Sequence, residues 1–188
     1  EVGGAELSLL PERAAWWSAE RTLLVADVHL GKAMSFRRLG VPVPGGTTRD
    51  TLDRLEALVR VHGAARIVFL GDLLHSRHAQ GAATLRALAD WRERHAGLDL
   101  VLVRGNHDAH AGDPPAALGV RCVDEPFVLA AAPRLALCHQ PRARPSHYVL
   151  AGHSHPCTSV GRGLERLRLP CFHIGEALGV LPAFGGFT

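Results

Sequence analysis

The chain has 188 residues, of which 47% are hydrophobic and 21% charged, an ordinary composition for one globular domain over residues 1–188. No apolar run approaches the roughly 18 residues of a membrane-spanning helix, so we expect no integral membrane protein. The net charge is +3, and a basic chain is mildly favoured to meet polyanions such as nucleic acids.

Three apolar runs in the first half of the chain predict strands, and each run ends in an acidic residue. These runs are TLLVAD (22–27), ARIVFLGD (65–72) and LDLVLVRGNHD (98–108). Between the first two, a helix is predicted that begins with a capping box of Thr47 and Asp50 and stops at Gly63. Residues 82–97 predict a second helix. Strand and helix alternate, which predicts two βαβ units around a largely parallel sheet.

After about residue 118 the chain changes to short strands with close turns, and no helix is predicted there. The segments are VRCVDEP, PFVLA, RLALCH, HYVLAGHSH and LERLRLPCFHI. They predict a second half in which antiparallel pairing prevails. We therefore expect an α/β (α+β) fold in which two mixed β-sheets pack on each other and are flanked by helices.

Polar side chains follow five of these strands at the point where each strand ends. Ligand sites of α/β sheets lie beyond the carboxyl ends of the strands, so we expect these side chains on one rim. Carboxylate, imidazole and amide oxygen are the ligands of divalent metals such as Mn²⁺, Fe²⁺ and Zn²⁺. The residues suited to bind metal are Asp27, His29, Asp72, Asn106, His139, His153 and His155.

The ordered motifs D-x-H, G-D, G-N-H-D, H and G-H-x-H, over residues 27–155, resemble the calcineurin-like metallophosphoesterase superfamily. Longer stretches resemble the ligase-associated DNA damage response phosphoesterases, a bacterial group of endonucleases or phosphodiesterases that accompany a DNA ligase and a helicase. These stretches are 27–55, 71–77, 104–115, 148–156 and 167–188. The resemblance implies a four-layer sandwich and a cytoplasmic hydrolase that acts on ester bonds in DNA repair.

The resemblance also implies a centre of two divalent metal ions, with Mn²⁺ expected first and Fe²⁺ or Zn²⁺ as alternatives. It assigns one metal to Asp27, His29 and His155, and the other to Asn106, His139 and His153, with Asp72 bridging both. His107 is then the general acid or substrate-stabilising imidazole, and Asp108 is the acid that orients it. A hydroxide that bridges the metals is the expected nucleophile.

Basic side chains near these motifs suit phosphodiester oxygens, although solvated surface residues are an equally good interpretation of each one. The expected substrate-binding residues are Lys32, Arg37, Arg38, His75, Arg77 and Arg142. Aromatic residues make up 5% of the chain, so no base-stacking platform is evident. We expect a phosphodiesterase that acts on DNA. The alternatives are a phosphatase of small substrates, a cyclic-nucleotide phosphodiesterase, and a non-catalytic scaffold, which the complete ligand set disfavours.

Overall fold

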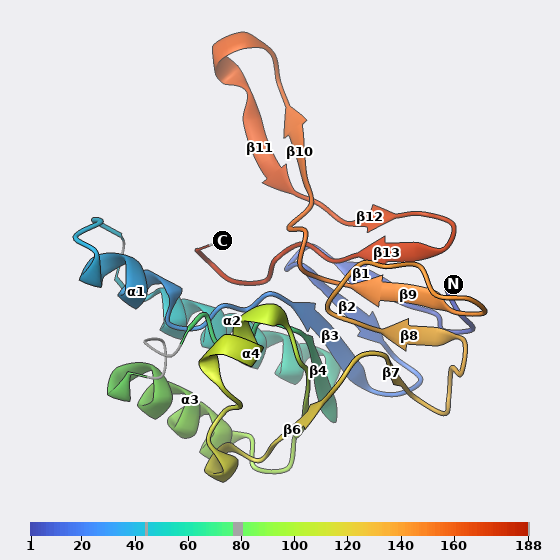
Figure 1. The fold of residues 1–188 in the computed structure, drawn as a ribbon, viewed down its shortest axis with the longest axis horizontal. Coiled ribbons are helices and arrows are strands. Elements are labelled where there is room, and N and C mark those ends of the chain that lie inside the picture. The colour runs from blue at the N-terminus through green and yellow to red at the C-terminus, as the bar shows by residue number, and fades with distance from the viewer. Residues whose placement is uncertain (44, 77–80, 188) are drawn as a thin grey trace.

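The computed structural model of the protein describes residues 1–43, 45–76 and 81–187. Its strands form two larger sheets that pack face to face, and helices cover the outer face of one sheet (Figure 1). Both sheets contain parallel and antiparallel pairs. The predicted α/β fold with two mixed sheets flanked by helices is therefore confirmed.

The first sheet has the strand order β1-β2-β3-β4-β5-β6. Its strands are β1 (Ser8–Leu10), β2 (Ala14–Trp17), β3 (Thr22–Ala26), β4 (Arg66–Leu70), β5 (Asp99–Val103) and β6 (Val120–Val123). From β3 to β6 all pairs are parallel. Ala26 pairs with Leu70, and Leu70 pairs with Val103. The residues that follow β3, β4 and β5 therefore leave the sheet at the same level.

Helices α2 (Thr47–His62) and α3 (Ala82–Arg94) cover this sheet with one apolar face. The chain also contains α1 (Lys32–Arg38), the short α4 (Asn106–Ala111), and two 3₁₀ turns, η2 (Ala116–Leu118) and, in a hairpin away from this sheet, η3 (Gly163–Glu165). Leu55 of α2 and Trp91 of α3 pack with Leu23 and other sheet residues in one buried cluster. A fully buried large apolar side chain contributes about 1.5–3 kcal/mol to folding. This cluster therefore fixes the helices against the sheet.

The ends of α2 agree only in part with the sequence analysis. The helix stops at Gly63, whose φ of 61° suits glycine, as predicted. The predicted capping box is wrong: the N-cap is Gly46, and no side chain caps the helix. Thr47 is already helical, and its carbonyl accepts a hydrogen bond from the Thr51 hydroxyl (2.8 Å). The left-handed backbone of Gly46 (φ 83°) brings the chain into the helix instead.

The second sheet has the strand order β12-β13-β9-β8-β7. Its strands are β7 (Phe127–Val128), β8 (Leu135–Leu137), β9 (Tyr148–Ala151), β12 (His173–Ile174) and β13 (Leu178–Val180). The expected antiparallel character is wrong for its centre, because β8, β9 and β13 pair in parallel and only the edge strands are antiparallel. The loops between the central strands carry the chain back to the same end, so β8 and β9 both finish at the rim.

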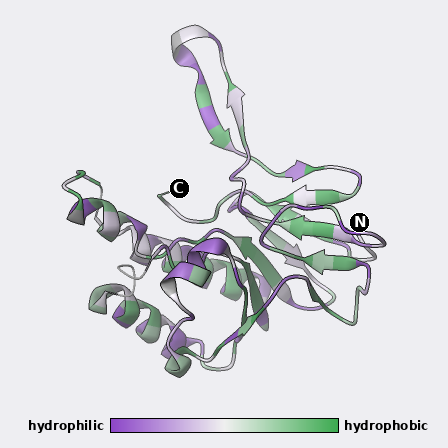
Figure 2. Ribbon diagram, viewed as in Figure 1, coloured by the Kyte–Doolittle hydropathy of each residue, from purple (hydrophilic) through white to green (hydrophobic). Residues whose placement is uncertain are grey.

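The two sheets share a buried interior. Leu24 and Leu70 of the first sheet pack with Leu137 and Leu150 of the second. Figure 2 shows the strands in this interior as predominantly hydrophobic, whereas α2 and α3 alternate in hydropathy along their length. The outer face of the second sheet carries a smaller cluster and, among the described residues, no helix. The described residues therefore form three layers, the helices and the two sheets, and the expected fourth layer is not among them.

A hairpin of β10 (Cys157–Val160) and β11 (Leu167–Pro170) pairs only with itself and projects away from both sheets (Figure 1). All eight residues of its strands are exposed. None of the described helices is long and apolar enough to span a membrane.

Candidate metal centre

Five of the seven predicted metal ligands have a positive φ, a backbone conformation that residues other than glycine rarely adopt. Each such residue costs about 1–3 kcal/mol, and these residues cluster at functional sites. They are Asp27 (51°), His29 (48°), Asp72 (50°), His153 (69°) and His155 (44°). The strained backbone at the strand ends thus marks the rim as a functional site, independently of the side-chain chemistry.

Asp72 lies between two groups of imidazoles. Its Oδ2 is 3.9 Å from Nε2 of His29, and its Oδ1 is 3.7 Å from Nε2 of His139. Burial raises the pKa of the Asp72 carboxyl, while the nearby His139 opposes that rise. The two oxygens of one carboxylate therefore face two different ligand groups, which is the placement that a bridging ligand requires.

The first ligand group consists of Asp27, His29 and His155, each of which offers one atom within 4.8 Å of the others. Nε2 of His29 is 3.3 Å from Nε2 of His155, which is 3.7 Å from Oδ2 of Asp27. Burial lowers the pKa of His29 to about 2, which keeps the imidazole in the neutral form that metals bind. Oδ1 of Asp27 is buried and has no hydrogen-bond partner among the described residues. A cation would satisfy this oxygen, so the group fits a metal.

The second ligand group meets at His139. Its Nε2 is 2.8 Å from Oδ1 of Asn106 and 2.9 Å from Nδ1 of His153. Nδ1 of His139 lies 3.2 Å from the carbonyl oxygen of Leu70 and donates its proton there. This hydrogen bond fixes the tautomer of His139, so that the lone pair of its Nε2 points toward Asn106 and His153. Three atoms that can each donate an electron pair to a metal converge here, which fits a second cation.

Glycines leave the space that the ligands need. A Cβ on Gly71 (φ 80°) would overlap the ring of His139. A Cβ on Gly152 would lie 2.7 Å from Oδ2 of Asp27, closer than real side-chain contacts come. Asp27, His29, Asp72 and His139 are buried, whereas Asn106 and His153 are exposed. The centre therefore has a buried floor and is open on one side.

His107 is half-buried beside the centre, with its ring 5.1 Å from that of His29. Its Nδ1 donates a hydrogen bond to the carbonyl oxygen of His75 (2.8 Å), and the two rings stack at 4.9 Å. With Nδ1 held in this way, Nε2 is the nitrogen left for a substrate. We expected Asp108 to orient this ring, but the orienting contact comes from His75.

Asp108 instead joins two loops of the first sheet. Its buried carboxylate accepts hydrogen bonds from the backbone N–H groups of Gly105 (2.9 Å), Asp72 (2.7 Å) and Leu73 (3.1 Å). Burial raises the pKa of the Asp108 carboxyl, and the N–H donor of Gly105 opposes that rise. Asp108 therefore holds the loop of Asp72 against the loop of His107, which is a positioning role.

The predicted substrate-binding residues lie in different environments. Lys32 is half-buried beside the centre: burial lowers the pKa of its ammonium group, and the nearby Asp27 and Asp72 oppose that. Arg37 turns away, with Nε 3.2 Å from the carbonyl oxygen of Val43, into a cavity of about 330 Å³ between α1, α2 and α3. Arg142 is exposed. Arg77 lies outside the described residues, and Arg38 is described only by its place in α1.

Glu125 supports the centre and was missed from the sequence. Its Oε2 accepts hydrogen bonds from the backbone N–H groups of His139 (2.8 Å) and Gln140 (2.9 Å). Arg144 lies 3.5 Å from its other oxygen. Glu125 stands in a turn far from any motif, so no local signal in the sequence pointed to this role.

Comparisons with known proteins agree with this geometry. The family model of calcineurin-like phosphoesterases matches residues 20–141. The crystal structure of the nuclease MPE from Pseudomonas putida is 49% identical, with a TM-score of 0.88, over 100% of this chain and 86% of its own. The protein of unknown function AQ665 from Aquifex aeolicus is 15% identical, with a TM-score of 0.50, over 71% of this chain and 78% of its own, which shows a shared fold alone. No curated protein matches the chain.

Proposed function

Because the chain belongs to the calcineurin-like phosphoesterase family and is a metal-dependent phosphoesterase, we propose that it hydrolyses phosphodiester bonds of DNA. The observation that carries the proposal is the position of Asp72, with one oxygen toward each of two ligand groups. A pair of cations held in this way suits the displacement of a group from phosphorus.

The donor set supports the assignment of the metals. We propose that Asp27, His29 and His155 hold one cation, that Asn106, His139 and His153 hold the other, and that Asp72 is shared. Nitrogen and oxygen donors without a thiolate suit Mn²⁺, which we propose as the metal. When bound, such cations lower the pKa of water to about 7 and offset charge on phosphoryl oxygens.

The chain's own residues would then position the substrate and move protons. His107, whose Nδ1 is engaged by the His75 carbonyl, presents Nε2 to a phosphoryl oxygen or to the leaving group. Lys32 offers an ammonium group beside the two carboxylates, where it offsets phosphate charge. Asp108 keeps the loop of His107 in register with the loop of Asp72.

Two observations favour a nucleic acid over a small substrate. A structure that is 49% identical over the full chain is that of a nuclease. The cavity of about 330 Å³ between the helices contains none of the seven proposed ligands, and Asn106 and His153 of the proposed centre are exposed. A site that is open on one side suits a polymer, whereas an enclosed pocket would favour a phosphatase of small substrates or a cyclic-nucleotide phosphodiesterase. A cytoplasmic role in DNA repair with a ligase and a helicase rests on the motif resemblance alone.

The test compares three substrates with the Mn²⁺-loaded protein: bis-p-nitrophenyl phosphate, p-nitrophenyl phosphate and end-labelled single-stranded DNA. We expect hydrolysis of the diester and cleavage of the DNA, abolished by a chelator and restored by added Mn²⁺. Hydrolysis of the monoester alone would contradict the proposal and support a small-substrate phosphatase.

A further inference from the structure

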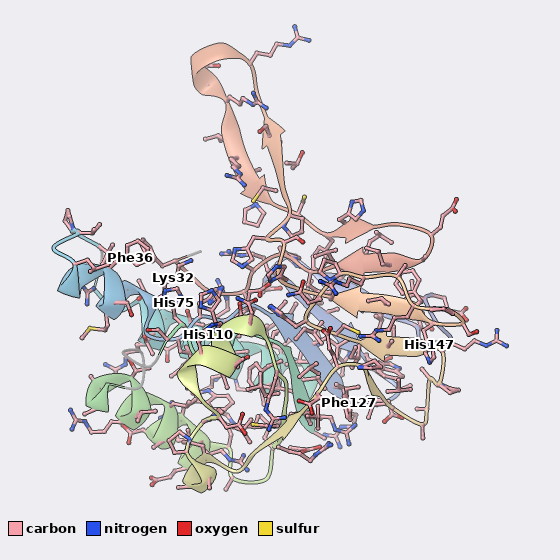
Figure 3. The ribbon with its side chains drawn as sticks, viewed as in Figure 1. Lys32, Phe36, His75, His110, Phe127 and His147 are labelled. Carbon is pink, nitrogen blue, oxygen red and sulfur yellow. The ribbon has the colours of Figure 1, made fainter. Side chains whose placement is uncertain are left out.

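Four aromatic rings form a continuous strip that begins at His107; we call it the aromatic strip. The ring centroids of His107 and His75 are 4.9 Å apart, those of His75 and Phe36 are 6.4 Å apart, and those of Phe36 and Phe187 are 5.4 Å apart. These separations are typical of rings in contact. Figure 3 shows Phe36, Lys32 and His75 on the same side of the molecule, beside α1.

The strip is not part of the hydrophobic core. Phe36 and Phe187 are half-buried and belong to none of the buried clusters of the described residues, whereas Phe184, only three positions before Phe187, is fully buried. Phe36 comes from α1, His75 from the loop after β4, His107 from α4 and Phe187 from the C-terminal segment. Four distant segments thus bring aromatic rings together next to the centre.

A positively charged side chain lies beside the aromatic strip. Lys32 is on the first turn of α1, four residues before Phe36, so both side chains lie on the same face of the helix. A small hollow between α1 and the C-terminal segment is lined by His29, Lys32 and Phe187. An ammonium group beside partly accessible aromatic rings is the combination that binds a phosphate and its neighbouring base in single strands.

We propose that the aromatic strip is a base-stacking subsite for single-stranded nucleic acid, in which a base next to the cleaved phosphate stacks on Phe36 and Phe187. The subsite rests on the proposed function, because it binds the substrate of the same metal centre. It requires unpaired bases, since the bases of a duplex already stack on one another. The low aromatic content of the chain did not indicate this platform, because that content counts only Phe, Trp and Tyr, whereas two of the four rings are histidines.

The test is an abasic scan with the Mn²⁺-loaded protein. Oligothymidylates that each lack one base are compared with the intact strand. For the wild type, we expect loss of a base at one or two positions beside the cleaved bond to lower kcat/KM about 10-fold or more. Phe36→Leu should lower kcat/KM on the intact strand by a similar factor and remove the sensitivity to the missing base, while Phe36→Tyr should restore both.

The matched control is Trp16→Leu on β2, because Trp16 is also half-buried but pairs with Leu23 near the start of β3, away from the rim, where its ring lies 5.0 Å from that of His62. This variant should behave as the wild type in the scan. If Phe36→Leu loses thermal stability but keeps its sensitivity to missing bases, the rings only pack the C-terminal segment and the subsite is wrong. If the wild type hydrolyses simple diesters but cleaves no oligonucleotide, the proposed DNA substrate and the subsite both fail.

Discussion

The two sheets supply different side-chain chemistry to the proposed metal centre. Asp27, Asp72 and Asn106 follow strands of the first sheet, so both carboxylates and the amide come from that side. His139, His153 and His155 follow β8 and β9 of the second sheet, so three of the four imidazoles come from the other side. Neither sheet carries a complete ligand set. The centre therefore depends on how the sheets pack, and its metals would join one sheet to the other.

The supports behind the two sets of ligands also differ. On the first sheet, Asp108 is buried and accepts backbone hydrogen bonds from two loops. On the second, Glu125 accepts two backbone hydrogen bonds from a single loop and keeps 25% of its side-chain surface exposed. We therefore expect the first sheet to hold its ligands more rigidly than the second, and the variants below test this difference.

Asp72→Asn should have the largest effect, because it removes the carboxylate charge that faces both ligand groups. We expect metal analysis to show loss of both equivalents of metal. Activity should fall by more than about 100-fold, a larger effect than that of substituting residues that hydrogen-bond to metal ligands. Retention of two equivalents would show that Asp72 does not bridge. Circular dichroism is the control for folding.

His107→Ala should lower turnover by roughly 100-fold while both metals stay bound, because the imidazole acts on the substrate and is not a proposed ligand. His147→Ala is the matched control, since the half-buried His147 directly precedes β9, its Nδ1 donates to the Pro145 carbonyl oxygen (2.9 Å), and it lies away from His75 in Figure 3. Unchanged kcat in the His107 variant would remove this residue from the mechanism.

Removal of the metals should loosen the second sheet more than the first. At about 100 times its Kd, a ligand stabilises the folded state by about 2.7 kcal/mol, which for this size corresponds to a melting temperature roughly 5–10 °C higher. Hydrogen exchange after chelation should rise more in β8 and β9 than in β4. Equal protection of all three strands would show that the metals do not join the sheets.

Asp108→Asn and Glu125→Gln form a matched pair with the smallest expected effects. Asp108→Asn places an amide among several N–H donors in the interior and should cost about 1–3 kcal/mol of unfolding free energy. Glu125→Gln, at a partly exposed carboxylate, should cost about 1 kcal/mol or less. Denaturant unfolding measures both. An equal or larger loss for Glu125→Gln would reverse the proposed difference in rigidity.

Local patterns were enough to locate the strand ends and the residues that follow them. Asp27 and Asp72 come directly after continuous apolar runs, and parallel strands in register bring such positions to one level. The end of α2 at Gly63 was likewise predictable from the local sequence. The parallel pairing of β8, β9 and β13 was not predictable, because strands of three or four residues have the same pattern in either direction.

The contacts of individual side chains depended on residues distant in sequence. Asp108 finds its donors at Asp72 and Leu73, and the His107 ring is held by a carbonyl of another loop. Arg37 looked suited to phosphate because of its neighbours in the sequence, but α1 directs it into the cavity between the helices. Helix α1 itself was not predicted, because it has only seven residues and no side-chain cap.

The left-handed backbone at the proposed ligands lowers the stability of the folded chain at the positions that its activity needs. His155 has a φ of 44°, which glycine adopts without penalty and histidine does not. In the absence of metal, replacing such a residue by glycine should therefore relax the backbone, so that a more durable but inactive protein lies one substitution away. The proposed role of His155 as a metal ligand would explain why an imidazole stands where glycine would be more stable.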